Sequence, residues 1–225
     1  MFINSHGWMS GFWNSITRRA TALGAVTLGS PMHRRQRRRG GAPVAALESR
    51  TLLAAFVVNS AADNTTVDRL TTLREAVILA NGNAGADTIT FGNGAGLGGT
   101  NFTDGGADTI TLSLGQMVIS QSLTITGLSA ARTIINGNNA SRIFDITGGA
   151  TTLAKLTLTG GRTTADSEGG GAIRSTSTGT LTVSQSTLSG NSTTGRAAYG
   201  GAIFSQTGAV TVSQSTLTGN RATLG

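Results

Sequence analysis

The chain has 225 residues, a hydrophobic content of 38%, a formal net charge of +7 and no cysteine. It can therefore bury a substantial core, but it cannot form disulfides or cysteine-ligated metal sites. Residues 1–50 contain eight arginines and one glutamate, whereas nine basic and nine acidic residues balance in residues 51–225. A nucleic-acid-binding fold would spread its basic side chains over the folded surface, so we expect no nucleic-acid partner. Both histidines, His6 and His33, precede residue 51, which excludes histidine-based triads and metal ligands from the remainder.

The first 55 residues form a basic segment that we expect to be disordered and to act in targeting or sorting. They lack strand alternation, and they contain no run of the ~18 apolar residues that a transmembrane helix needs. The stretch HRRQRRRGGAPVAALESRTLL, from His33, resembles the LEPR-XLL segment of planctomycete surface proteins, although Ser49 stands where that family has proline. This resemblance implies export to the cell surface, with five sorting residues: Leu47, Glu48, Arg50, Leu52 and Leu53. The alternative is an ordinary linker. Because such segments usually lie near the start of a chain, we also expect Met32 rather than Met1 to be the initiator.

A helix is predicted at about residues 73–81, in the sequence TTLREAVILAN. Leu73, Val77 and Ala80 recur at helical spacing, a threonine precedes them as a cap, and Asn81-Gly82 ends the segment. The stretch resembles the CSLREA motif of bacterial surface proteins, without its cysteine and serine. We expect this helix to cover the first turn of the domain that follows.

From Gln116 onward one phrase recurs, most clearly as GGAIRSTSTGTLTVSQSTLSGN and GGAIFSQTGAVTVSQSTLTGN. Leu158, Leu188 and Leu217 stand 30 and 29 residues apart, a period typical of a solenoid. Aliphatic residues align between copies and polar residues alternate with them, which predicts coils of three short strands stacked in parallel ladders. The pattern is similar to the right-handed parallel β-helix of polymorphic outer-membrane-type proteins. We therefore predict an all-β solenoid over residues 56–225, truncated at its C-terminus, whose uncapped last coil could self-associate end to end.

Candidate binding residues occur in two insertions between the strands. RTTADSEGG contains Asp166 and Glu168, and the equivalent insertion one coil later contains Arg196 and Tyr199. Since equivalent loops of successive coils lie side by side, these four residues are candidates for a small ligand-binding patch. The alternative is a set of solvated loop side chains.

Three further acids have simpler structural explanations. Asp145 should project outward into solvent from between two core residues of a strand. Asp87 and Asp108, in two copies of GADTIT, should bond nearby backbone N–H groups.

Two functions remain open on this evidence. The first is a secreted or cell-surface, structural or adhesin-like β-helix protein without catalytic activity, cofactor or metal, whose partners are polysaccharides or cell-envelope components. The second is a carbohydrate-active β-helix protein that binds or cleaves polysaccharide, which a cluster of Asp145, Asp166 and Glu168 would favour. A gene fragment without function is a third possibility.

Overall fold

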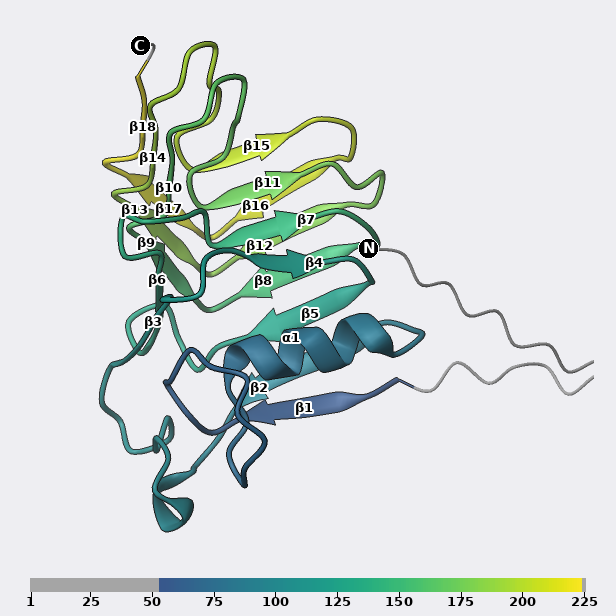
Figure 1. Cartoon of the computed structure of the whole chain (residues 1–225), viewed down its shortest axis with the longest axis vertical. Helices are drawn as coiled ribbons and strands as arrows, with labels where there is room; N and C mark the ends of the chain where they lie inside the picture. The colour runs from purple at the N-terminus through teal and green to yellow at the C-terminus, as the bar shows by residue number, and fades with distance from the viewer. Residues whose placement is uncertain (1–52, 224–225) are drawn as a thin grey trace, which may run out of the picture. The chain divides into compact units, whose positions relative to one another are not determined.

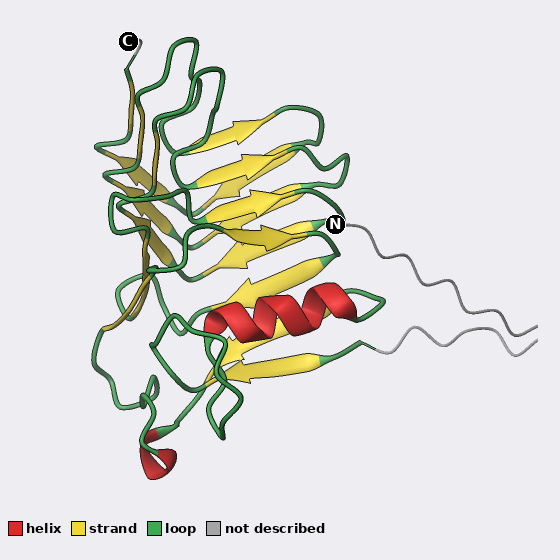
Figure 2. Ribbon diagram, viewed as in Figure 1, coloured by secondary structure: helices red, strands yellow, loops and turns green. Residues whose placement is uncertain are grey.

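Residues 53–223 are described by a computed structural model, and within this range the chain forms a parallel β-helix (Figure 1). Its strands form four parallel sheets, and the largest sheet receives one strand from each of six successive coils. The described range contains one α-helix, near its start (Figure 2). The predicted solenoid is therefore confirmed. Residues 1–52 of the basic segment lie outside the described residues, and so do four of the five expected sorting residues, Leu47, Glu48, Arg50 and Leu52.

We name three of the four sheets by their places in Figure 1 and the fourth by its short strands. The back sheet consists of β1 (Ala55–Val58), β2 (Asp87–Phe91), β5 (Leu123–Thr126), β8 (Thr151–Ala154), β12 (Leu181–Ser184) and β16 (Val210–Ser213). The front sheet consists of β4 (Met117–Ile119), β7 (Phe144–Ile146), β11 (Ile173–Ser175) and β15 (Ile203–Ser205). The side sheet consists of β3 (Asp108–Thr111), β6 (Thr133–Asn136), β9 (Thr157–Thr159), β13 (Thr187–Ser189) and β17 (Thr216–Thr218). The short sheet consists of β10 (Arg162–Thr163), β14 (Ser192–Thr193) and β18 (Arg221–Ala222). The helix is α1 (Leu73–Gly82), and a 3-10 turn, η1, spans Ala95–Leu97.

The core consists of aliphatic ladders that run along the axis of the solenoid. The predicted register is confirmed pair by pair, including Ile173 beside Ile203 and Leu188 beside Leu217. Each interior coil buries its members of these ladders; Val183 and Leu188, for example, are completely buried. Full burial of such a side chain stabilises a protein by roughly 1.5–3 kcal/mol. The repetition of the sequence therefore supplies each coil with the apolar surface that its neighbour needs.

The later coils contain one more strand than predicted. From β7 onward each described coil has four strand segments, because β10, β14 and β18 follow the strands of the side sheet. The extra strands are only two residues long, so apolar alternation cannot mark them in the sequence.

The Gly-Asn pair that ends the repeated phrase turns the chain at its glycine and links neighbouring coils at its asparagine. Gly190 has φ of +64°, as expected for a tight turn, but Asn191 does not have positive φ. Instead Asn191 is completely buried and its side chain bonds the coil before it: its Oδ1 accepts from the N–H of Gly161 at 2.8 Å, and its Nδ2 donates to the carbonyl of Leu158 at 3.0 Å. Asn220 repeats the arrangement one coil later by donating to the carbonyl of Leu188. The asparagines form a hydrogen-bonded ladder that links coils.

Helix α1 takes the place of a front-sheet strand in the early coils. It begins with a capping box, in which Thr72 and Glu75 exchange bonds between side chain and backbone. Leu73, Val77 and Ala80 are buried, as predicted, and they belong to the same core cluster as Val58 of β1 and Ile89 of β2. The helix thus covers the early coils from the front.

Two polar side chains of α1 bond the open edge of β4, a role that the sequence did not suggest. Asn81 donates to the carbonyl of Val118 at 2.7 Å and accepts from the N–H of Ser120 at 2.9 Å, so its carboxamide replaces a neighbouring peptide group. Arg74 donates to the carbonyls of Gly115 and Gln116 and forms an ion pair with Asp63. An unpaired strand edge is a site of unwanted association, and these contacts occupy it.

Candidate polar site at the front corner

The candidate site lies beside two loops that connect the short sheet to the front sheet (Figure 1). We call residues 164–172 the first loop and residues 194–202 the second loop. Each returns to its strand through a turn with positive φ, at Gly170 (+74°) and Gly200 (+66°). A Cβ at either glycine would lie 2.0 Å from a backbone carbonyl oxygen, of Ile173 and Ile203 respectively. Glycine is therefore required in both copies of the phrase.

The two loops lie side by side, as the sequence predicts. The N–H of Ser167 donates to the carbonyl of Arg196 at 2.7 Å, and the N–H of Arg196 donates to Oδ1 of Asp166 at 2.8 Å. Farther along, the N–H of Gly170 donates to the carbonyl of Tyr199 at 2.9 Å. The second loop is thus built on the first, and whatever fixes the first loop also positions the second.

Arg142 is the side chain that fixes the first loop. Its side chain is 2% exposed, and its Nε and Nη2 donate to the carbonyls of Gly170 (2.9 Å) and Gly169 (3.0 Å). Nη2 also forms an ion pair with Glu168, and Nη1 donates to Oε1 of Gln116 at 2.9 Å. One buried guanidinium therefore joins the loop to the coil below it. Its planar fork of donors suits such a multiple contact.

A second arginine completes the network. Arg174 of β11 lies in register with Asp145 of β7, and its Nε and Nη2 each donate to that carboxylate at 2.8 Å. Its Nη1 donates to Oε1 of Glu168 at 3.0 Å. Gln116 joins the same group by donating to Oδ2 of Asp145 at 3.3 Å. We call these five residues the arginine network. Two guanidinium and two carboxylate groups balance its charge.

The network favours the charged forms of Glu168 and Arg174. The hydrogen bond from Arg142 is the main cause that lowers the pKa of Glu168, against partial burial, which acts in the opposite direction. The hydrogen bond to Asp145 is the main cause that raises the pKa of Arg174. A general acid needs a carboxyl group whose pKa is raised toward neutrality, and Glu168 is shifted the other way. The arrangement favours ion pairing over proton transfer.

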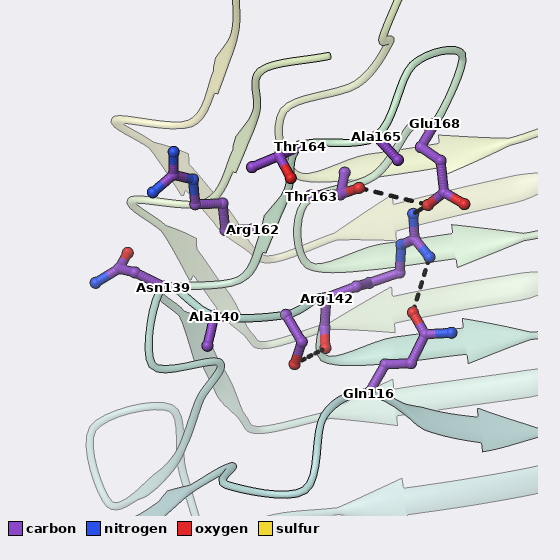
Figure 3. A pocket seen from close by; sticks show the side chains of 10 residues that line it. Gln116, Asn139, Ala140, Arg142, Arg162, Thr163, Thr164, Ala165 and Glu168 are labelled. Atoms are coloured by element: carbon purple, nitrogen blue, oxygen red, sulfur yellow. Dashed lines mark hydrogen bonds and ion pairs between the residues drawn. The ribbon is translucent and has the colours of Figure 1, made fainter.

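A pocket of about 360 Å³ opens beside Arg142 and Glu168. Figure 3 shows Arg142 extending toward Gln116 and Glu168, while Arg162 and Asn139 lie on the opposite side of the group. Thr163 and Thr164 line the pocket as well, and Thr163 donates to Glu168 at 3.4 Å. The volume is near the lower end of the ~300–1,000 Å³ found for small-molecule sites, and its polar groups converge from three coils.

The structure separates the four binding residues predicted from the sequence. Glu168 turns into the arginine network and the pocket. Asp166 caps the backbone of Arg196 instead of joining Glu168. Tyr199 is 58% exposed and stacks on Phe204, with ring centroids 6.3 Å apart. The predicted patch is thus divided into a polar pocket and an exposed aromatic surface.

The other acids differ in part from their expected roles. Asp145 projects away from the core, but it is only 5% exposed, because Arg174 and Gln116 cover it; the expectation of a solvated side chain is wrong. Asp87 is completely buried and accepts from the N–H of Ala54, which is distant in sequence rather than nearby. Burial is the main cause that raises the pKa of Asp108.

Sequence reasoning missed Arg142, Arg174, Gln116 and Arg162. A signal for Arg174 was present: aligning GGAIRS with SRIFDI places it directly beside Asp145, and opposite charges at paired positions attract. Arg142 had a weaker signal. Counting back from the pair of Phe144 and Ile173, it stands where the next coil has Gly171, so it departs from the repeat.

Comparison with protein-family models gives no matching family, and comparison with curated proteins and with solved structures gives no similar protein. Across residues 53–223, α1 is too short to cross a bilayer, and no other helix there could do so. The same range holds no group of three or more acidic or histidine side chains placed to bind a metal ion. The functional argument therefore depends on the fold and on the arginine network.

Proposed function

We propose that this protein is a non-catalytic, adhesin-like β-solenoid of the cell surface, in which the first and second loops form a binding surface for polysaccharide or another cell-envelope component. One observation carries the proposal. The arginine network uses its charged groups to fix a loop, and it leaves a preorganised polar pocket beside that loop. A rigid site lowers the entropy cost of binding.

The stacked aromatic pair of Tyr199, which is exposed, and Phe204, which is half-buried, supports the same function. Tyr199 and Phe204 stack at an interplanar angle of 21°, next to the end of the second loop. Aromatic rings offer a flat apolar face and, in tyrosine, a polar group at its edge, which suits a ligand with both apolar and hydroxyl surfaces. Saccharides have this character, so the ring pair and the pocket could contact different units of one chain.

Secretion to the cell surface is the location that fits this function, and it follows from the two resemblances to surface-protein segments.

End-to-end self-association belongs to the same proposal. Val210, Val212 and Leu217 of the last described coil are 40%, 42% and 49% exposed, which gives that coil an apolar edge. Cell fractionation with surface proteolysis tests the location, and sedimentation across a concentration series tests the association.

The binding function is tested with the full chain and a panel of neutral and acidic polysaccharides. We expect retention of the protein on at least one polysaccharide, with no release of shortened products. The matched variant is Gly170→Ala, which forces the first-loop turn to open and should abolish retention while the coils stay folded by circular dichroism. If Gly170→Ala is still retained on the polysaccharide, the binding surface lies outside the first loop and the proposal is contradicted.

A carbohydrate-active enzyme is the second candidate, because the fold brings Asp145 and Glu168 to the same guanidinium, that of Arg174. The cluster is incomplete, since Asp166 bonds the second loop instead. Both carboxylates are engaged by arginine, which leaves neither as an evident proton donor. Release of shortened products that stops in Glu168→Gln would decide for the enzyme.

A further inference from the structure

The wall of the pocket has an unbalanced positive charge. Arg142 is compensated by Glu168, and Arg174 is compensated by Asp145 and Glu168. Arg162 also lines the pocket, its side chain is exposed, and it forms no ion pair with any residue in the range 53–223. The pocket therefore has a neutral floor and one available guanidinium at its rim.

The groups around Arg162 are hydroxyls and an amide. Thr163, Thr164 and Asn139 line the same pocket, and Thr164 and Asn139 are exposed. In Figure 3 the side chains of Arg162 and Asn139 lie on one side of the pocket and Thr164 lies above it. These groups can donate and accept hydrogen bonds with a hydroxyl-rich ligand, while a guanidinium pairs best with a carboxylate or sulfate.

We infer that the pocket binds one acidic saccharide unit, with its carboxylate or sulfate on Arg162 and its hydroxyls on Thr164 and Asn139. This inference rests on the proposed binding function and specifies its ligand class. Glu168 does not repel such a ligand strongly, because both of its oxygens already accept bonds from arginine. The main attraction is at an exposed side chain, so binding should weaken as the salt concentration rises.

Arg221 provides a matched control for Arg162. Both occupy the first position of a short-sheet strand, and the register runs from Arg162 through Ser192 to Arg221. Arg221 is exposed and does not line the pocket. Arg162→Gln and Arg221→Gln therefore remove the same charge from the same kind of position, but only the first removes it from the pocket.

The experiment measures binding of glucuronate, glucose 6-sulfate, glucose and inorganic sulfate to the full chain by ligand-detected NMR at low salt. We expect the two acidic sugars to bind most tightly, Arg162→Gln to weaken them about tenfold or more, and Arg221→Gln to leave them unchanged. Thr164→Val should weaken glucose and the acidic sugars alike. The preferred acidic sugar distinguishes a carboxylate from a sulfate ligand.

Four results would overturn the inference. Equal losses in Arg162→Gln and Arg221→Gln, or inorganic sulfate binding as tightly as the sugars, would indicate general charge attraction. Equal binding of glucose and glucuronate would remove the acidic preference while the proposed saccharide-binding function stands. If no sugar binds and no polysaccharide of the panel retains the protein, both the acidic-saccharide inference and the proposed binding function are wrong.

Discussion

The contacts of the arginine network predict that Arg142 is needed to hold the first loop in place. Replacing Arg142 with leucine removes four hydrogen-bonded contacts, to Gly169, Gly170, Glu168 and Gln116. The two carbonyls lose a charged donor in a buried place, and Glu168 keeps only Arg174 and Thr163. We therefore expect the loop to separate from the coil below it, and the second loop to loosen with it.

The magnitude follows from the burial of the pair. Breaking a fully buried ion pair by removing one partner costs about 3–5 kcal/mol. Here Arg142 is buried, but Glu168 is 32% exposed and retains a second arginine, so we expect a loss at the lower end, about 3 kcal/mol. Arg162→Gln should change stability by less than about 0.5 kcal/mol, because surface substitutions away from such contacts have small effects.

Native-state hydrogen exchange is the suitable assay, because coils of a solenoid can open separately and one global unfolding curve can hide a local loss. In Arg142→Leu, amides of residues 167–173 should exchange much faster, while Val183 and Leu188 in the core keep their protection. Unchanged exchange in the loop would show that Arg142 does not fix it. Equal acceleration throughout the solenoid would show that its effect is on the whole fold.

Three further predictions concern other contacts. Arg142 holds the pKa of Glu168 below its ordinary value of 4.5, so the ionised carboxylate stabilises the fold fully above that pH and loses this effect as pH falls through the lowered pKa. On acidification, the midpoint of unfolding should therefore fall more for the wild type than for Glu168→Gln. Arg74→Lys should destabilise α1 and β4 by about 1–3 kcal/mol, because a lysine ammonium has three donors and no planar fork, whereas Arg74 makes four hydrogen bonds, two to Asp63 and two to the carbonyls of Gly115 and Gln116. Hydrogen exchange of the helix amides measures this loss. Asn191→Ala should lower the free energy of unfolding, measured by chemical denaturation, by about 2–3 kcal/mol, because two buried backbone groups lose a hydrogen-bond partner. Asn220→Ala, at the partly exposed end of the ladder, should lower it less. Equal losses in the two variants would contradict the ladder.

The fold could be predicted from the sequence because its information is repeated. A single aliphatic residue says little, but Val183 aligned with Val212 and Leu188 with Leu217 fix a register that the structure confirms. The helix was predictable for a related reason, since its apolar spacing and Thr72 cap are local signals. Periodicity could not reveal what Asn191 does, because a turn residue and an inward ladder residue have the same place in a repeat.

The site was less predictable because its residues break the repeat rather than follow it. Arg142 contacts Gly169 and Gly170, which are 27 and 28 residues away, and no local pattern in the sequence joins them. Yet a solenoid converts such distances into adjacent coils, since one period is 30 or 29 residues. Charged residues that depart from an otherwise neutral repeat are therefore the positions to test first. Their neighbours can be found by adding or subtracting one period, as the pair of Asp145 and Arg174 shows at a separation of 29.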